Sequence, residues 1–359
     1  MQVHIFTSDG VYSSAFLKII EKEPRILEHY FVFRKKTRIF SAPPPSSLVK
    51  RISYSTNIFS LTFRTLPMLY KAKWIYFHYL PYGPSLLIWS ILPKVIRKST
   101  WIIWGGDVSI NRDKNKSFIN QLYEILRKVL IPKFKEIASF IEEDSIEAMK
   151  IYKFNPKYNQ ILYPIPFDHE CYENFTKTEN QPYVSILIGN SGDPSNFHLE
   201  ALSMVERFKS KNIKVFCPLS YYYDYQYINK VIKYGYMVLG EVFTPMTELL
   251  PVKEYSYFLT KIDIAIMNHN RQQGLGNILP LLYLGKKIYL RNDISTFRFL
   301  KNIGCVINSV DEIKNLSFQK FIEIGSDQTS INRQLISLIT SEDYCFNLWH
   351  QLFIHHYND

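Results

Sequence analysis

The order in which apolar and amphipathic segments follow each other limits the possible folds of this chain more than any single residue does. Short apolar runs typical of buried strands, such as residues 3–6, 74–79 and 263–267, are separated by stretches with helical periodicity. Strands that alternate with helices indicate parallel sheets with helices packed on both faces. We therefore predict an α/β fold made of doubly wound, Rossmann-like sheets.

The chain is long enough for two domains, because 359 residues exceed the size at which a single hydrophobic core usually stops growing. The alternation of strands and helices is interrupted between residues 155 and 182, where several prolines and a polar stretch occur. We therefore expect one domain over residues 1–165, a linker over 166–182 and a second domain over 183–340. An amphipathic helix in the last segment, residues 341–359, is expected to cross back to the first domain.

The amphipathic patterns also predict individual helices. In the first domain we expect helices over residues 48–69 and 144–152, the second of them capped by Asp144. In the second domain, residues 268–277 are polar and contain glycines, so we expect a loop there, followed by a helix over residues 279–284.

The charge balance points to an anionic partner. The formal net charge is +11 at pH 7, which suits a nucleotide sugar, a nucleic acid or an acidic membrane. A nucleic acid is the weakest of these three, because the chain has no arginine-rich arm and no RNA-binding aromatic signature. The four cysteines are widely spaced and fit no metal pattern, and without a secretion signal they indicate a reducing cytoplasm.

One uncharged run and two basic segments bear on membrane association. Residues 74–93 contain no Lys, Arg, Asp or Glu, but two prolines and a glycine interrupt the middle of the run, so we predict no transmembrane span. Residues 92–98 and 122–135 mix basic and apolar side chains. Interfacial helices have this pattern, and so do core-facing helices with a solvated basic side. The sequence leaves both interpretations open.

The segment of residues 184–198 carries the clearest binding signal. An apolar strand ends at Gly189, a polar turn follows, and a helical pattern then begins. Glycine lets a ligand approach the backbone, and the amides at a helix N-terminus attract anions such as a diphosphate. The alternatives are an ordinary turn capped by Asp193 or Ser195, and a solvent-facing helix position for His198. The expected substrate-binding residues here are Gly189, Asn190, Ser191, Gly192, Ser195, Asn196 and His198.

A second segment, residues 268–277, follows the predicted strand over residues 263–267. It combines an arginine, two adjacent glutamine amides and two glycines in a polar loop. Loops at the carboxyl ends of neighbouring parallel strands lie on one edge of the sheet, where open α/β folds bind ligands. Arg271 either pairs with a phosphate there or is a solvated loop residue. The expected substrate-binding residues are Arg271, Gln272, Gln273, Gly274 and Gly276.

Three further residues follow or end predicted strands. Asp107 and His78 are the candidate catalytic residues, because a carboxylate or imidazole at a strand end can orient or deprotonate a hydroxyl. The alternatives are a helix-capping role for Asp107 and a structural role among tyrosines for His78. Pro218 follows the strand over residues 213–217 and is expected to contact a nucleotide base. The chain has no Asp-x-Asp motif, so we expect neither a metal nor another cofactor.

Three motifs together resemble a known enzyme family. They are Ile103-Trp-Gly-Gly-Asp107, Leu187-Ile-Gly-Asn-Ser-Gly-Asp-Pro-Ser-Asn-Phe-His198 and Arg271-Gln-Gln-Gly-Leu-Gly276. In this order and spacing they are similar to signatures of the TDP-Fuc4NAc:lipid II Fuc4NAc transferases, glycosyltransferase family 56. The resemblance extends over the whole chain. It implies a GT-B fold, in which two Rossmann-like domains face each other across a cleft.

The resemblance also implies an activity. This is the retaining, metal-independent transfer of 4-acetamido-4,6-dideoxygalactose (Fuc4NAc) from a dTDP donor to an undecaprenyl-diphosphate-linked disaccharide. The product serves enterobacterial common antigen or related O-antigen-type surface polysaccharides. The first domain would then face the acceptor and an anionic membrane, and the second would bind the nucleotide sugar. The enzyme would be peripheral to the cytoplasmic face of the bacterial inner membrane.

Some residues depart from the family pattern. They are Ile102, Ser109 and Asn277, and they leave the identity of the two sugars open. The main alternative to an enzyme is a non-catalytic nucleotide-sugar-binding or glycan-binding protein on the same fold. A basic nucleic-acid binder is the third alternative.

Overall fold

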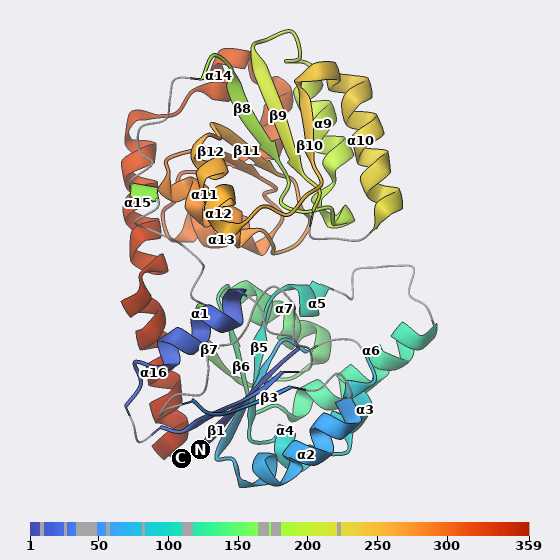
Figure 1. Cartoon of the computed structure of the whole chain (residues 1–359), viewed down its shortest axis with the longest axis vertical. Coiled ribbons are helices and arrows are strands. Elements are labelled where there is room, and N and C mark those ends of the chain that lie inside the picture. The colour runs from blue at the N-terminus through green and yellow to red at the C-terminus, as the bar shows by residue number, and fades with distance from the viewer. Residues whose placement is uncertain are drawn as a thin grey trace. The chain divides into compact units, whose positions relative to one another are not determined.

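A computed structural model describes most of the chain (Figure 1). The residues that it describes are 1–7, 11–24, 27–33, 49–54, 58–80, 83–109, 118–163, 172–173, 181–220 and 224–358. The chain forms two compact units. Unit 1 consists of Met1–Pro166 and Thr340–Asp359, and unit 2 consists of Phe167–Ile339.

Unit 1 is built on a parallel sheet. Its described strands are β1 (Gln2–Phe6), β2 (His29–Phe33), β3 (Val49–Tyr54), β4 (Trp74–His78), β5 (Ser99–Ile103), β6 (Glu136–Ser139) and β7 (Lys157–Gln160). They lie in the order β3-β2-β1-β4-β5-β6-β7, so the direction of winding reverses between β1 and β4. The central strands β1, β4 and β5 are almost entirely buried, because both faces of the sheet are covered.

Helices pack on both faces of this sheet (Figure 1). They are α1 (Val11–Ile20), α2 (Ile58–Lys71), α3 (Ser85–Ser90), α4 (Pro93–Ile96), α5 (Gly106–Ser109), α6 (Phe118–Leu130), the 3-10 turn η2 (Ile131–Lys133), α7 (Glu142–Tyr152) and α16 (Glu342–Asn358). One core cluster joins the sheet to α1 and α16, and another joins it to α2, α3, α4, α6 and α7.

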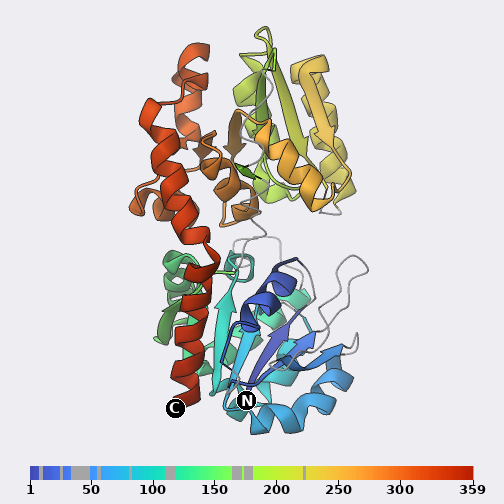
Figure 2. The same cartoon turned by 60° about the vertical axis from the view of Figure 1, so that its left-hand side comes forward.

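The C-terminal helix α16 belongs to unit 1 and lies beside its sheet (Figure 2). The Trp349 side chain is fully buried, its ring centroid lies 4.5 Å from that of Phe16, and its Nε1 donates to Leu162 O over 2.7 Å. The apolar face of α16 therefore completes one core of unit 1.

Three local predictions for unit 1 were wrong. The segment expected to form a single helix over residues 48–69 contains an edge strand, β3, before α2 begins at Ile58. Strand β7 falls inside the segment that we expected to interrupt the alternation. Asp144 lies within the first turn of α7, and the N-cap position is Ile141. For β3 and β7, pairing with a neighbouring strand outweighs the local residue preference.

Unit 2 is built on a second parallel sheet. Its described strands are β8 (Val184–Ile188), β9 (Ile213–Pro218), β10 (Phe243–Met246), β11 (Ile264–Met267), β12 (Lys287–Leu290) and β13 (Asn308–Ser309). Their order is β10-β9-β8-β11-β12-β13, so the winding reverses between β8 and β11.

The helices of unit 2 surround this sheet. They are the 3-10 turns η3 (Pro194–Asn196), η4 (Gly240–Val242) and η5 (Val310–Asn315), and the α-helices α9 (His198–Glu206), α10 (Tyr225–Leu239), α11 (Val252–Thr260), α12 (Leu275–Tyr283), α13 (Ser295–Asn302), α14 (Phe318–Ile322) and α15 (Ser326–Thr340). Helix α12 begins four residues earlier than predicted, because Gly274 takes the N-cap position with φ +71°. In the described ranges of both units, every helix is too short or too polar to cross a bilayer.

The Trp349→Ala variant tests whether α16 completes the core of unit 1. Loss of this buried indole is expected to lower the free energy of unfolding by about 3–5 kcal/mol. Leu338→Ala removes a side chain that is 63% exposed, so a change within about 0.5 kcal/mol is expected for this control. Urea unfolding followed by circular dichroism measures both, and equal effects would show that α16 does not contribute to the core.

Candidate functional site

The carboxyl ends of β8 and β11 form the edge of unit 2 at which the order of its strands reverses. Open α/β sheets bind ligands at such a switch point, because the loops on its two sides diverge and leave room between them. The first predicted segment follows β8, and the second follows β11. We call residues 189–196 and 270–276 together the loop pair.

The two segments of the loop pair contact each other directly. The Arg271 Nη2 lies 3.0 Å from the Asp193 Oδ2, and both side chains are only partly exposed. The Ser195 hydroxyl donates to Gln273 Oε1 over 2.9 Å, and Gln273 Nε2 donates to Asn190 Oδ1 over 3.3 Å. The structure therefore places the arginine and a glutamine of the second segment against the turn of the first.

Asn196 holds the turn after β8 in shape. Its side chain is fully buried, and its Oδ1 accepts the N–H of Asn190 over 3.2 Å. Its Nδ2 donates to the carbonyl oxygens of Ser191 and Asp193, each over 3.1 Å. Asn196 therefore acts on a ligand only through the turn that it supports.

Two main-chain amides of the turn after β8 do not match the prediction that this segment binds an anion. The N–H of Gly189 donates to Ile266 O over 3.0 Å, and the N–H of Gly192 donates to Ser220 O over 3.3 Å. These two amides are used within the protein and do not point at a ligand. Pro218 is buried at the end of β9. It lies two residues before Ser220, whose carbonyl oxygen accepts the hydrogen bond from the Gly192 N–H.

His198 lies beneath the turn and not on the helix surface. Its side chain is fully buried, and its Nδ1 lies 3.1 Å from the Tyr227 hydroxyl, which also accepts the His198 N–H. Burial lowers the pKa of His198 to about 4, so the ring is neutral at pH 7. A Cβ at Gly189, where φ is +71°, would lie 2.6 Å from His198 Nε2. The histidine and the glycine therefore pack against each other.

His269 supports the second segment of the loop pair, and the sequence did not single it out. The side chain is fully buried, and its Nδ1 donates to Arg271 O over 2.7 Å. Burial lowers the pKa of His269 to about 4, so this ring is also neutral at pH 7. A histidine in a polar loop gives no local signal of burial, which is why the pattern missed it.

Helix α12 begins at the loop pair. A Cβ at its N-cap residue Gly274 would lie 3.3 Å from the side chain of Asn190. Gly276 is in the first turn, where the amides carry the positive end of the helix dipole. The neighbouring Gln272 is half-buried, and its Oε1 meets no hydrogen-bond donor among the residues described.

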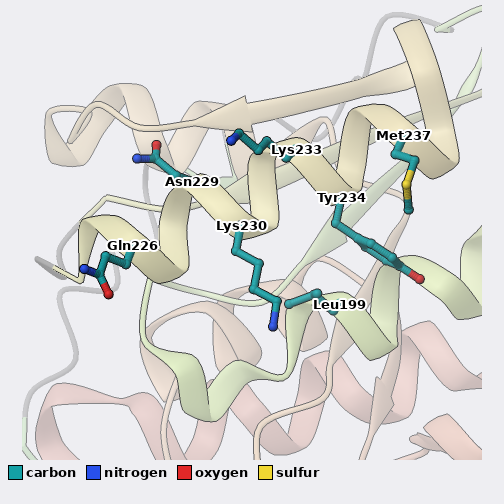
Figure 3. A pocket seen from close by; sticks show the side chains of 7 residues that line it. All are labelled: Leu199, Gln226, Asn229, Lys230, Lys233, Tyr234 and Met237. Carbon is teal, nitrogen blue, oxygen red and sulfur yellow. The ribbon is translucent and has the colours of Figure 1, made fainter.

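A shallow hollow of about 560 Å³ lies between α9 and α10 (Figure 3). The side chains of Lys230 and Tyr234 point from α10 toward Leu199 on α9. None of the lining residues belongs to the loop pair, and none was predicted to bind substrate. The lining residues are Leu199, Gln226, Asn229, Lys230, Lys233, Tyr234 and Met237.

In the described part of the chain, one cluster in unit 1 has the composition of a metal site. The ligand atoms of Glu136, His355 and His356 lie within 4.8 Å of one another at the amino end of β6. However, Lys157 Nζ lies 2.6 Å from His355 Nε2 and 3.7 Å from Glu136 Oε1. The ammonium group supplies the positive charge, so the cluster acts as a salt-bridge network that fastens α16 to the sheet.

Asp107, in the short helix α5 that follows β5, is fully buried and surrounded by donors. Its Oδ2 accepts from Trp101 Nε1 over 2.8 Å and from Leu80 N over 3.2 Å, and its Oδ1 accepts from Trp104 N over 3.0 Å. Burial raises the pKa of Asp107, and the nearby Arg127 opposes this shift. The geometry favours a positioning role over contact with a hydroxyl, and the catalytic role stays a prediction.

His78 lies in a buried row of three histidines. Its Nε2 lies 3.0 Å from His4 Nδ1, and His4 Nε2 lies 3.0 Å from His29 Nδ1. His78 Nδ1 contacts the Tyr163 hydroxyl. Burial lowers the pKa of His78 and His4, and it lowers that of His29 to about 3. This position suits the structural alternative, and the catalytic role of His78 also stays a prediction.

The residue after β4 has an unusual backbone. Tyr79 has φ +71°, a conformation that costs a residue with a side chain roughly 1–2 kcal/mol. Its N–H donates to Ile102 O over 3.0 Å. The fully buried Arg127 donates to Leu80 O and, over 2.6 Å, to Asp107 O. Asp107 accepts the N–H of Leu80 and Arg127 donates to the Leu80 carbonyl oxygen, so the residue after Tyr79 is held on both sides, which explains how the strain persists.

The sequence profile of one protein family matches most of the chain. Residues 70–354 match the family described as 4-alpha-L-fucosyltransferase glycosyl transferase group 56. The matched range includes every candidate site residue of both units. The resemblance inferred from the three motifs is confirmed.

Solved glycosyltransferase structures resemble the chain over its length. HepE of Anabaena, in complex with UDP-glucose, has a TM-score of 0.70 at 10% sequence identity, with 100% of this chain and 99% of that chain covered. A glycosyltransferase from Rickettsia africae has a TM-score of 0.68 at 12% identity, with 100% and 99% covered. WaaG, which is involved in lipopolysaccharide biosynthesis, has a TM-score of 0.61 at 10% identity, with 98% of each chain covered. The predicted GT-B fold class is confirmed.

Substitution of Gly189 tests the packing of the turn against His198. Gly189→Ala is expected to lose about 1 kcal/mol of stability through its positive φ and a further 1–3 kcal/mol through the clash. Gly304→Ala is the control, because Gly304 also has a positive φ, +94°, but its added Cβ would meet only Leu335 Cδ1, at an ordinary contact distance of 3.6 Å. Urea unfolding compares the two, and equal losses would contradict the packing.

Proposed function

Because the chain belongs to the 4-alpha-L-fucosyltransferase family, glycosyl transferase group 56, and is a glycosyltransferase, we propose that it transfers a Fuc4NAc-like sugar from a dTDP donor. The proposed acceptor is an undecaprenyl-diphosphate-linked disaccharide in the synthesis of a bacterial surface polysaccharide, of enterobacterial common antigen or O-antigen type. In this proposal unit 2 binds the nucleotide sugar and unit 1 binds the acceptor.

The chemistry defines what the donor site must do. The bond between the anomeric carbon and the β-phosphate oxygen breaks, and a bond forms from that carbon to an acceptor hydroxyl oxygen, which loses its proton. The nucleoside diphosphate leaves with additional negative charge, so groups that stabilise this charge accelerate the reaction. We propose retention of the anomeric configuration without a metal, as the family resemblance implies.

The loop pair is the observation that carries the proposal. Arg271, which Asp193 holds in place, supplies a cation beside the first turn of α12. An arginine together with a helix N-terminus binds a diphosphate through charge and amide hydrogens. Gln273 and Ser195 add hydrogen-bonding groups that suit sugar hydroxyls. The presence of UDP-glucose in the solved HepE structure supports a nucleotide-sugar donor.

Arg271→Ala is expected to reduce turnover about 100-fold, the usual effect of losing one donor that stabilises developing charge. The assay measures dTDP released from dTDP-Fuc4NAc in the presence of the lipid-linked acceptor. Arg298→Ala removes an exposed arginine of α13 and is expected to keep full activity. Undiminished turnover in Arg271→Ala would remove this residue from the site.

Helix α6 carries apolar side chains on two sides. Leu130 is buried and Tyr123 and Leu126 pack against the core of unit 1, whereas Leu122 is 45% exposed and Ile125 is 57% exposed. Helix α3 packs against α6, and Leu87 on α3 and Ile91 directly after it are also exposed. One side of α6 therefore faces the core, and the exposed apolar side supports the interfacial interpretation. We call this surface the apolar face; it consists of Leu87, Ile91, Phe118, Ile119, Leu122, Ile125 and Val129.

The charges around the apolar face suit an anionic lipid surface. Lys94, Arg97, Lys128 and Lys135 are exposed near it. In residues 85–98 and 118–135 the only acidic residue is Glu124, which is buried. Apolar side chains that enter the headgroup region, flanked by cations, are typical of interfacial helices. We propose that the apolar face binds the cytoplasmic side of the inner membrane and that the protein is peripheral.

A double substitution tests the membrane proposal. Leu122→Ser with Ile125→Ser is expected to weaken binding to phosphatidylglycerol-containing vesicles at least tenfold, because two apolar side chains no longer leave water. Met237→Ser with Leu338→Ser changes two exposed apolar residues of other helices and serves as the control. Vesicle flotation measures binding, and equal binding of both double variants would exclude the apolar face as the contact.

A further inference from the structure

The carboxyl edge of the unit 1 sheet carries a group of aromatic side chains at its own switch point. Tyr12 follows β1 at the start of α1, Tyr79 follows β4, and Trp104 follows β5. All three are half-buried. The Tyr12 and Trp104 rings are 5.6 Å apart between centroids, and Trp104 also packs on Tyr163 at 4.6 Å. We call Tyr12, Tyr79 and Trp104 the aromatic platform.

The backbone at Tyr79 adopts a strained conformation at the switch point of unit 1. Three non-glycine residues in the described ranges have positive φ: Tyr79, Lys153 and Phe197. Lys153 ends helix α7, where this conformation is ordinary. Phe197 lies between the loop pair and α9 in unit 2. Tyr79 occupies the corresponding switch point of unit 1, and strained residues concentrate at ligand sites.

Two buried residues hold the platform in position. Asp107 accepts hydrogen bonds from the N–H groups of Leu80 and Trp104, the residues next to or within the platform. Arg127 donates to the carbonyl oxygens of Leu80 and Asp107. The buried Asp107 and Arg127 therefore fix the backbone conformation near Tyr79 and Trp104.

We propose that the aromatic platform binds a pyranose ring of the acceptor glycan and that Asp107 and Arg127 are its positioning residues. Aromatic rings offer an apolar face to the C–H groups of a sugar. The switch point of a parallel sheet is where such a ligand enters. This inference rests on the proposed function, because it takes unit 1 as the acceptor-binding unit.

Tryptophan fluorescence reports directly on the platform. Of the five tryptophans, Trp104 is half-buried and the other four are at most 8% exposed, so acrylamide quenches mainly Trp104. The probe is the free disaccharide released from the lipid-linked acceptor. We expect it to reduce the quenching constant about twofold in the wild type and to have no effect in Tyr79→Ala. If the disaccharide does not protect the wild type from quenching, the proposal is overturned, regardless of whether the donor site binds a nucleotide sugar.

Steady-state kinetics separates positioning from general damage to the fold. Tyr79→Ala, Tyr79→Gly and Asp107→Asn are expected to raise the KM for acceptor about tenfold and to leave the KM for dTDP-sugar within about twofold. Tyr79→Phe is expected to retain most of the acceptor affinity. Tyr79→Gly relieves the positive φ, so its thermal stability is expected to be at least that of the wild type.

One control variant and two contrary outcomes separate the platform from the proposed transferase activity. Tyr70→Ala removes a tyrosine of α2 that is 47% exposed and is expected to leave both KM values unchanged. An unchanged acceptor KM in Tyr79→Ala and Tyr79→Gly would overturn the platform and leave the proposed transferase activity intact. Failure of the wild type to release dTDP would contradict the proposed function, and the fluorescence titration would still decide the platform.

Discussion

The ion pair between Arg271 and Asp193 is the interaction on which the site of unit 2 depends. It joins segments that are 78 residues apart in the chain and that follow the neighbouring strands β11 and β8. A partly exposed pair of this kind contributes on the order of 1 kcal/mol or less to stability, so its importance is geometric. It fixes the Arg271 guanidinium in the loop that leads into α12, whose first turn carries the positive end of the helix dipole and favours an anion.

Both units fix the loops at their switch points in the same way. A fully buried polar side chain accepts or donates several backbone hydrogen bonds and thereby sets the path of the loop that follows a strand. Asn196 does this in unit 2, and Asp107 with Arg127 does it in unit 1. Such residues carry strong sequence signals, but they act on a ligand through the loops that they hold. This explains why several predicted contact residues are buried.

Features that depend on the local residue pattern were predicted from the sequence. Features that depend on tertiary packing were missed. The apolar runs of β8 and β11 were recognisable, because the strand pattern is a local property. Gly189 was expected to let a ligand approach the backbone, but in the structure the space of its missing Cβ is taken by His198, which only packing determines. The burial of His198 and His269 depends on Tyr227 and on the loop backbone, which no local pattern reveals. For α6 the periodicity showed an amphipathic helix, but only the structure shows that apolar side chains such as Leu122 and Ile125 stay exposed beside a side that buries Arg127 and Leu130.

Hydrogen exchange in the presence of dTDP tests the central claim most directly, because it reports on both segments of the loop pair in one experiment. Peptides from residues 189–196 and from residues 270–277 are predicted to gain protection together as the nucleotide saturates the protein. Peptides from β10 and α10 serve as an internal reference and are predicted to stay unchanged. Protection in only one of the two segments, or in neither, would contradict a diphosphate site built from their contact.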